Sequence, residues 1–139
     1  MFWDSSALVP LLVPETRSRA LADVMRLDRQ VALWWGTIVE CHSAIHRRRR
    51  VSERGEKELE RAISRLTELS EDSDTVAPSE EIRRRAISLL SIHDLSAADA
   101  LQLSAAIAWG EGRGAGESFV CLDDRLAAAA RLEGFVVRP

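Results

Sequence analysis

Short apolar runs recur along the chain, and polar residues that favour a helix start follow most of them. The runs are rich in aromatic and β-branched residues, and their apolar character is continuous rather than alternating. Continuous apolar strands separated by helices are typical of a parallel sheet that is covered on both faces. The pattern therefore predicts a three-layer α/β/α sandwich with a central, mostly parallel sheet of four to five strands. The predicted strands cover residues 1–3, 31–35, 119–122 and 135–137, and a weaker pattern at 75–77 allows a fifth.

The segments between these strands carry helix start signals and helical spacing. Residues 78–81 (Pro-Ser-Glu-Glu) form a strong start, and Ser96 precedes a helix that is almost wholly apolar. Four of the seven glycines lie within residues 110–116, which predicts a loop. The predicted helices cover residues 7–13, 15–27, 37–50, 52–69, 78–91, 97–109 and 124–132.

Length and composition favour one globular domain over residues 1–139. Hydrophobic residues make up 46% of the chain and charged residues 29%, which is ordinary for a folded domain. The formal net charge is -3, so the molecule as a whole does not attract nucleic acid. A nucleic acid could therefore bind only at a local basic patch.

The chain shows no sign of membrane insertion or secretion. No apolar run approaches the roughly 20 residues that span a bilayer, and the N-terminus lacks the pattern of a signal peptide. The two cysteines, Cys41 and Cys121, lie far apart in apolar segments, which indicates reduced thiols in the core. We therefore expect a cytoplasmic protein without a membrane partner.

Acidic residues follow the predicted strands or begin the predicted helices. Asp4 ends the first strand, and Asp123 with Asp124 ends the strand at 119–122. Glu40 and Asp99 lie in the first turns of helices that follow a loop or a strand end. Ligands of an open α/β sheet bind beyond the carboxyl ends of its strands. Four carboxylates are therefore expected to meet at one edge of the sheet.

Each of these acids also has a structural explanation. Thr37 with Glu40, and Ser96 with Asp99, fit the spacing of a capping box, and Asp4 and Asp123 are suitable N-caps. As a set, however, crowded carboxylates would repel one another, and a divalent cation would relieve that repulsion. Ligands that are all oxygen suit Mg²⁺ or Mn²⁺. The only lysine, Lys57, lies in the middle of a predicted surface helix and is a poor substitute for the ion.

Four segments resemble the motifs of the PIN-domain family, in order and in spacing, over essentially the whole chain. The segment around Asp99 is the most specific of the four. The size of the chain resembles that of the small VapC-type toxins. The segments are Asp4–Val9 with Glu15, Thr37–Glu40 with Ser43 and Ala44, Leu95–Leu103, and Phe119–Leu126 with Gly134–Val137.

The resemblance implies a Mg²⁺- or Mn²⁺-dependent endoribonuclease that acts as the toxin of a VapBC-type pair. Its catalytic metal ligands would be Asp4, Glu40, Asp99 and Asp123, with Asp124 as the alternative to Asp123. Ser6 would be a supporting hydroxyl near the metal or the scissile phosphate. The resemblance further implies a VapB-like antitoxin as partner, and we expect a homodimer. The alternative is a catalytically silent PIN-fold module that binds RNA or protein.

An arginine run follows the predicted Glu40 helix and could bind RNA phosphates. A helix C-terminus also favours positive charge, so the run has an equally good structural explanation. The run consists of Arg47, Arg48, Arg49 and Arg50.

Two other features are less informative. His42 and His46 have the spacing of half a zinc site, but ordinary helix-surface histidines explain them better. Trp34, Trp35 and Trp109 lie in apolar segments, where core or dimer contacts are more common than stacking on bases.

Overall fold

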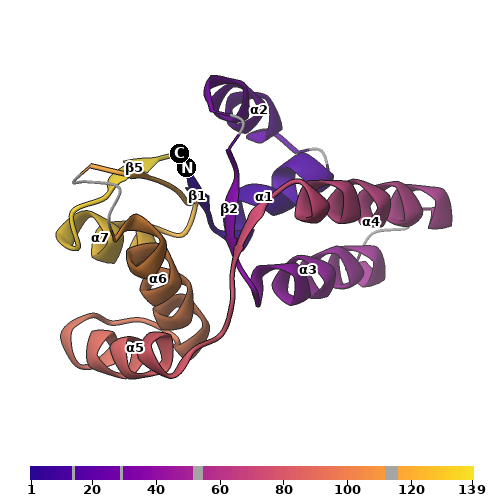
Figure 1. The fold of residues 1–139 in the computed structure, drawn as a ribbon. Coiled ribbons are helices and arrows are strands. Elements are labelled where there is room, and N and C mark those ends of the chain that lie inside the picture. The colour runs from indigo at the N-terminus through magenta and orange to yellow at the C-terminus, as the bar shows by residue number, and fades with distance from the viewer. Residues whose placement is uncertain (14, 29, 52–54, 112–115) are drawn as a thin grey trace.

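The computed structural model describes residues 1–13, 15–28, 30–51, 55–111 and 116–139, apart from the side chains of residues 49 and 51. In this part of the chain each strand except the last is followed by one or two helices (Figure 1). None of the helices in these ranges is long and apolar enough to cross a membrane. The strands are β1 (Phe2–Trp3), β2 (Ala32–Trp34), β3 (Asp74–Val76), β4 (Ser118–Val120) and β5 (Val136–Arg138). The helices are α1 (Ser5–Leu12), α2 (Ser18–Leu27), α3 (Thr37–Val51), α4 (Glu56–Glu71), α5 (Glu80–Ile92), α6 (Ala97–Gly110) and α7 (Asp124–Leu132).

The described strands form one five-stranded sheet in the order β3-β2-β1-β4-β5. Every neighbouring pair is parallel, which confirms the predicted α/β sandwich. The weak pattern at 75–77 does form a strand, β3, at one edge of the sheet. The chain order reverses between β1 and β4, and in sheets of this kind ligands bind beyond the carboxyl ends of the strands at that point.

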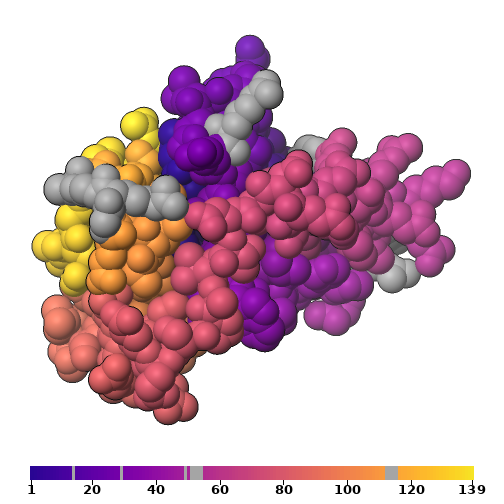
Figure 2. Space-filling model, in the orientation of Figure 1, coloured from indigo at the N-terminus to yellow at the C-terminus, as the bar shows by residue number. Residues whose placement is uncertain are grey.

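Helices cover both faces of the sheet. Figure 1 shows α1 to α4 on one side of the strands and α5 to α7 on the other. Helices α3 and α4 pack against each other and extend together beyond the sheet, as the space-filling view also shows (Figure 2). The molecule therefore has the three layers that the apolar strands predict.

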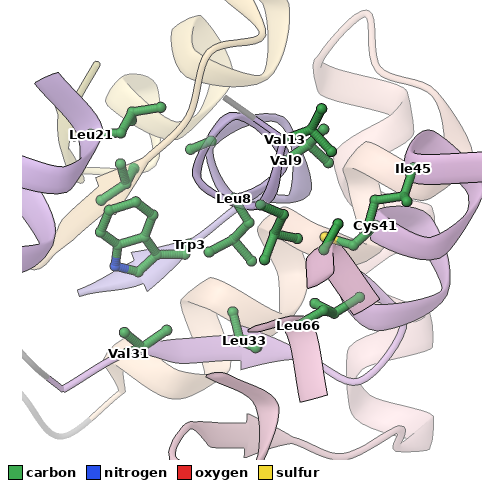
Figure 3. Close-up of a cluster of buried hydrophobic side chains, with 14 of the residues drawn as sticks. Trp3, Leu8, Val9, Val13, Leu21, Val31, Leu33, Cys41, Ile45 and Leu66 are labelled. Carbon is green, nitrogen blue, oxygen red and sulfur yellow. The ribbon is translucent and has the colours of Figure 1, made fainter. Parts of the chain in front are cut away.

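Alternation along the strands divides the core into two clusters. Trp3, Leu33 and Val120 point to the face covered by α1 to α4. There they meet Leu8 of α1 and Cys41 of α3, both completely buried (Figure 3). Successive side chains of a strand point to opposite faces, so β1, β2 and β4 contribute to both clusters.

The second cluster lies under α5, α6 and α7. Phe2 and Phe119, one residue away from Trp3 and Val120, stack with their ring centroids 5.7 Å apart. Leu103 of α6 and Leu126 of α7 complete this layer, and all four side chains are completely buried. The apolar helix predicted after Ser96 is thus α6, a core helix.

Some element ends differ from the prediction. β4 ends at Val120 rather than at residue 122, because the backbone N–H of Leu122 donates to the Ser6 hydroxyl at 2.9 Å instead of continuing the sheet. α2 begins at Ser18 rather than at Glu15, because the backbone N–H of Glu15 donates to Ser18 Oγ at 2.7 Å and closes a turn. The helix start predicted at residue 52 and most of the loop predicted at 110–116 lie outside the described residues.

Candidate active site

Asp4 follows β1 directly and caps α1 at the carboxyl edge of the sheet. Its side chain is only 3% exposed. Oδ2 accepts a hydrogen bond from the backbone N–H of Ser6 at 2.9 Å, and Oδ1 accepts one from Gln102 Nε2 at 2.9 Å. Burial raises the pKa of Asp4, and the negative charge of Asp99 raises it further, whereas hydrogen bonds from Ser6 lower it. Asp4 is thus a buried acid whose ionised form is disfavoured.

Glu40 lies in the first turn of α3 and is half-buried. Its Oε2 is 3.5 Å from Gln102 Nε2, so one amide group approaches both Glu40 and Asp4. Burial raises the pKa of Glu40, the Ser5 hydroxyl lowers it, and the charges of Asp4 and Asp99 raise it. The charge of Asp99 therefore acts on both Asp4 and Glu40, and the charge of Asp4 acts on Glu40.

Asp99 lies in the first turn of α6 and forms a capping box with Ser96. Its Oδ2 accepts from Ser96 Oγ at 2.7 Å and from the backbone N–H of Ser96 at 3.3 Å. In return, the backbone N–H of Asp99 donates to Ser96 Oγ at 3.2 Å. The capping role that the sequence left open is confirmed. It coexists with the electrostatic effect of Asp99 on Asp4 and Glu40.

The other predicted capping box, between Thr37 and Glu40, is wrong. Thr37 is the first residue of α3 and is completely buried. Its hydroxyl donates to Gln102 Oε1 at 3.1 Å, and Glu40 approaches the amide of the same glutamine. Both side chains therefore face the acidic site.

Asp123 lies three residues beyond β4 and caps α7. Its Oδ1 accepts from the backbone N–H groups of Arg125 and Leu126, each at 2.9 Å. The buried thiol of Cys121 lies between Asp123 and Asp4: its Sγ accepts from the backbone N–H of Asp123 at 3.3 Å and is 3.7 Å from Asp4 Oδ2. Asp123 thus adjoins the site through Cys121.

Asp124 is the first residue of α7 and is exposed. An acid at this position favours the helix N-terminus through the helix dipole. The cap contacts belong to Asp123, and the alternative between the two acids as a ligand stays open.

The acids do not yet form a ligand set. In the described part of the chain, no three His, Cys, Asp or Glu side chains are arranged to hold one metal ion together as they stand. Binding of one ion by several of these acids would therefore require their side chains to change position.

Sequence reasoning did not place Gln102, Thr37, Ser5 and Cys121 around the acids, although it considered Thr37 as a helix cap and Cys121 as a core thiol. Gln102 is completely buried within α6, between apolar neighbours. A buried amide costs free energy unless it is hydrogen-bonded, so a lone glutamine in an apolar helix is itself a signal of a polar partner. The partners could not be named, because they lie 62 and 98 residues away along the chain.

A cleft of about 820 Å³ opens beside the acids. It lies between α1, α3 and the start of α6, and it also receives residues from the α1–α2 connection. Glu40 reaches it directly, as do Ser5 and Ser6. The cleft is lined by Ser5, Ser6, Val9, Glu15, Arg17, Val39, Glu40, Ser43, Ala44, Arg47, Arg48, Ala98 and Leu122.

Two arginines of the predicted run line this cleft. Arg47 is exposed, and Arg48 forms an ion pair with Glu15 at 2.7 Å across it. Arg50 is exposed near the end of α3, and the side chain of Arg49 lies outside the described residues. Arg17, which the sequence did not single out, joins them at the cleft wall.

The remaining candidates lie in ordinary structural positions. The rings of His42 and His46 stack on α3 with centroids 6.2 Å apart, and His93 Nε2 contacts Glu133 Oε1 at 2.8 Å. Trp34 is buried in the core, whereas Trp35 is 57% exposed. Both cysteines are free and buried, as predicted.

Comparison with known proteins identifies the class. The chain matches the model of the PIN domain over residues 1–132, and it belongs to the PIN-domain family. PIN domains are typically nucleases, and they generally use a divalent metal. No curated protein matches the chain.

Solved structures of similar fold include VapC and FitB toxins of toxin–antitoxin complexes. A toxin–antitoxin complex from Klebsiella pneumoniae aligns with a TM-score of 0.69 at 16% identity, covering 97% of this chain and 94% of that one. VapC20 from Mycobacterium tuberculosis, a sarcin-ricin loop cleaving toxin, aligns with a TM-score of 0.70 at 21% identity over 99% and 98%. FitAcB from Neisseria gonorrhoeae gives 0.64 at 18% identity over 98% and 94%. At these identities the likeness shows the fold alone.

Proposed function

We propose that this protein is a Mg²⁺- or Mn²⁺-dependent endoribonuclease and the toxin of a VapBC-type pair. The observation that carries the proposal is the group formed by Asp4, Glu40 and Asp99 at the point where the strand order reverses. These acids come from three separate elements, and a cleft with arginines in its wall adjoins them.

The donor set fits a hard divalent cation. Its candidate ligands are carboxylate oxygens, which Mg²⁺ and Mn²⁺ prefer. Within the described residues, none of the acids in question forms an ion pair with a Lys, Arg or His side chain. A divalent ion would therefore reduce a repulsion among these acids that no ion pair in this part of the chain offsets. The proposed ligands are Asp4, Glu40, Asp99 and Asp123, with Asp124 as the alternative to Asp123.

The protein's own groups would prepare the site for a phosphodiester. A divalent ion, when bound, supplies activation of water and neutralisation of charge on the leaving oxygen. The Ser6 hydroxyl accepts a hydrogen bond from the backbone N–H of Leu122. This hydrogen bond holds the hydroxyl at the cleft beside Asp4. We propose that Ser6 supports the metal or the scissile phosphate from that position.

The cleft arginines are the proposed RNA contacts. The net charge of -3 provides no general attraction, so phosphate binding depends on local positive charge. Arg47 and Arg48 line the cleft beside Glu40, and Arg50 follows them on α3. Arg49 belongs to the same proposal through the sequence alone.

The proposal also includes a partner protein. The similarity to toxin–antitoxin complexes supports a VapB-like antitoxin as partner.

We also propose that two copies of this chain form a homodimer. Trp109, which the sequence suggested as a possible dimer contact, packs against Phe2 with their ring centroids 6.0 Å apart. The exposed side chains of Ile87, Leu90 and Ile92 on α5 are therefore better suited to a contact between two copies. A solution mass equal to one chain would contradict the dimer.

The test is product-end mapping of labelled RNA incubated with the purified protein and Mn²⁺ or Mg²⁺. We expect cleavage that EDTA abolishes and products with 5′-phosphate and 3′-hydroxyl ends. A 2′,3′-cyclic phosphate, or cleavage that survives EDTA, would contradict the mechanism. RNA or protein binding without metal-dependent cleavage would support the catalytically silent module instead.

A further inference from the structure

We infer that Gln102 is a positioning residue that holds Asp4 and Glu40 together for the divalent ion. The inference rests on the proposed function, because it assigns Gln102 to the site that would bind the metal. It goes further in naming a neutral side chain, outside the acidic set, that controls how well the site binds its ion.

The position of Gln102 connects three elements at the acidic site. It lies three residues after Asp99 on α6, and residues with this spacing share one face of a helix. Its amide nitrogen is 2.9 Å from Asp4 Oδ1, after β1, and 3.5 Å from Glu40 Oε2, on α3. Gln102 is completely buried, and its contact with Asp4 is buried too, so water does not compete for that contact.

Thr37 fixes which way the amide faces. The Thr37 hydroxyl donates to Gln102 Oε1 at 3.1 Å, and Thr37 is also completely buried. If the amide were reversed, its oxygen would face two carboxylate oxygens, and acceptors repel one another. Thr37 therefore directs the amide donors of Gln102 towards Asp4 and Glu40.

An amide can perform this task without replacing the ion. Each ionised carboxylate offers about four lone-pair sites, and Gln102 uses one on each of its two partners. A lysine or arginine in its place would neutralise the acids permanently and would oppose cation binding. Groups that orient metal ligands by hydrogen bonding typically change metal affinity by about 10- to 100-fold when they are removed.

The experiment is Mn²⁺ titration of the metal-free full chain, in which unbound Mn²⁺ is measured by electron paramagnetic resonance. Gln102→Met keeps the volume and the helix but removes the amide. We expect it to weaken Mn²⁺ binding by about 10-fold or more. The matched control is Ser104→Ala, which removes a buried hydrogen bond of the same helix, from Ser104 Oγ to the Ile82 carbonyl at 2.8 Å. It should lose thermal stability but keep its Mn²⁺ affinity within about two-fold of the wild type.

Thr37→Val provides a second variant, because it removes only the hydroxyl that orients the amide. We expect a smaller loss of Mn²⁺ affinity in the same direction, and little further loss when it is combined with Gln102→Met, since both changes act on one contact. This variant decides the question if Gln102→Met does not fold.

The outcomes separate this inference from the proposed function. Wild-type protein that binds Mn²⁺ together with a Gln102→Met variant that binds it equally tightly would overturn the role of Gln102 alone. Equal losses in Gln102→Met and Ser104→Ala would also overturn it, because they would reflect general loosening of α6. Wild-type protein that binds no Mn²⁺ would overturn the metal site and, with it, this inference.

Discussion

At Asp4 the protein keeps a carboxyl group almost entirely out of water and close to two other acids. Burial is the largest influence on its pKa and raises it, and the charge of Asp99 acts in the same direction. The backbone N–H of Ser6 and the amide of Gln102 supply hydrogen bonds that make this burial tolerable. A structural core gains little from such an arrangement, whereas a cation-binding site requires acids that lack a permanent basic partner.

This environment predicts how the stability of the metal-free protein depends on pH. Because the folded-state pKa of Asp4 is raised, the folded protein holds a proton over a pH range in which the unfolded chain has released it. The free energy of unfolding should therefore fall as the pH rises from the ordinary pKa of an aspartate through the raised value. Glu40, whose pKa burial also raises, contributes in the same direction.

Asp4→Asn should flatten that dependence, since asparagine does not titrate. The measurement is urea unfolding in EDTA at a series of pH values from 4 to 8, roughly the range in which raised carboxyl pKa values act. The exposed Asp94→Asn is the control and should leave the slope unchanged. An Asp4→Asn variant with the slope of the wild type would show that Asp4 is ionised as easily in the folded as in the unfolded chain.

At the scale of elements, the sequence predicted the α/β sandwich and the placement of each strand and helix to within a few residues. Continuous apolar runs and Ser or Asp helix starts are local signals, so Asp4 after β1 and the capping box of Ser96 could be predicted from the chain alone. The end of β4 at Val120 could not, because it depends on the Ser6 hydroxyl, 116 residues away in sequence. The hydrogen-bond partners of Gln102 could not be predicted either, because they are also far away in the sequence.

The end of α7 allows a specific prediction about stability. Gly134 follows α7 with φ +92°, a conformation that side chains with a Cβ adopt at a cost, although a Cβ there would meet no atom within 4 Å. Gly134→Ala should therefore lower the free energy of unfolding by about 1 kcal/mol for conformational reasons only. Gly55, the N-cap of α4 with φ -66°, has equally open surroundings, so Gly55→Ala is the matched control.

Denaturant unfolding of the two variants measures both effects. We expect Gly55→Ala to stay within about 0.5 kcal/mol of the wild type. Equal stability of Gly134→Ala and Gly55→Ala would mean that the left-handed conformation at residue 134 has no cost in this protein.

For the whole molecule, the question is how a chain with a net charge of -3 would bind a polyanion. Arg17, Arg47 and Arg48 gather at the cleft beside the acidic site, whereas Arg83 and Arg84 lie on α5, which does not line the cleft. Local placement of charge would then determine binding, and the total charge would not.

A pair of double variants separates these two possibilities. Arg47→Glu with Arg48→Glu reverses two cleft charges and breaks the ion pair with Glu15. Arg83→Glu with Arg84→Glu changes the net charge equally and breaks the ion pair of Arg83 with Glu80 on α5. RNA affinity is measured in EDTA, where cleavage is not expected. The affinity of the cleft variant should fall by about 10-fold or more relative to the wild type, and that of the α5 variant should fall much less. Equal losses would contradict the cleft as the RNA site.

The most direct test of metal-dependent cleavage is the rate at which labelled RNA is cut in Mn²⁺ by three proteins: the wild type, Asp4→Asn and Asp94→Asn. Both substitutions remove one carboxylate charge, but Asp4 is buried in the proposed metal site and Asp94 is 96% exposed. We predict cleavage by the wild type and by Asp94→Asn at similar rates, and a loss of at least about 100-fold in Asp4→Asn. Cleavage by Asp4→Asn at the wild-type rate would contradict the account, because the activity would then come from somewhere other than this site.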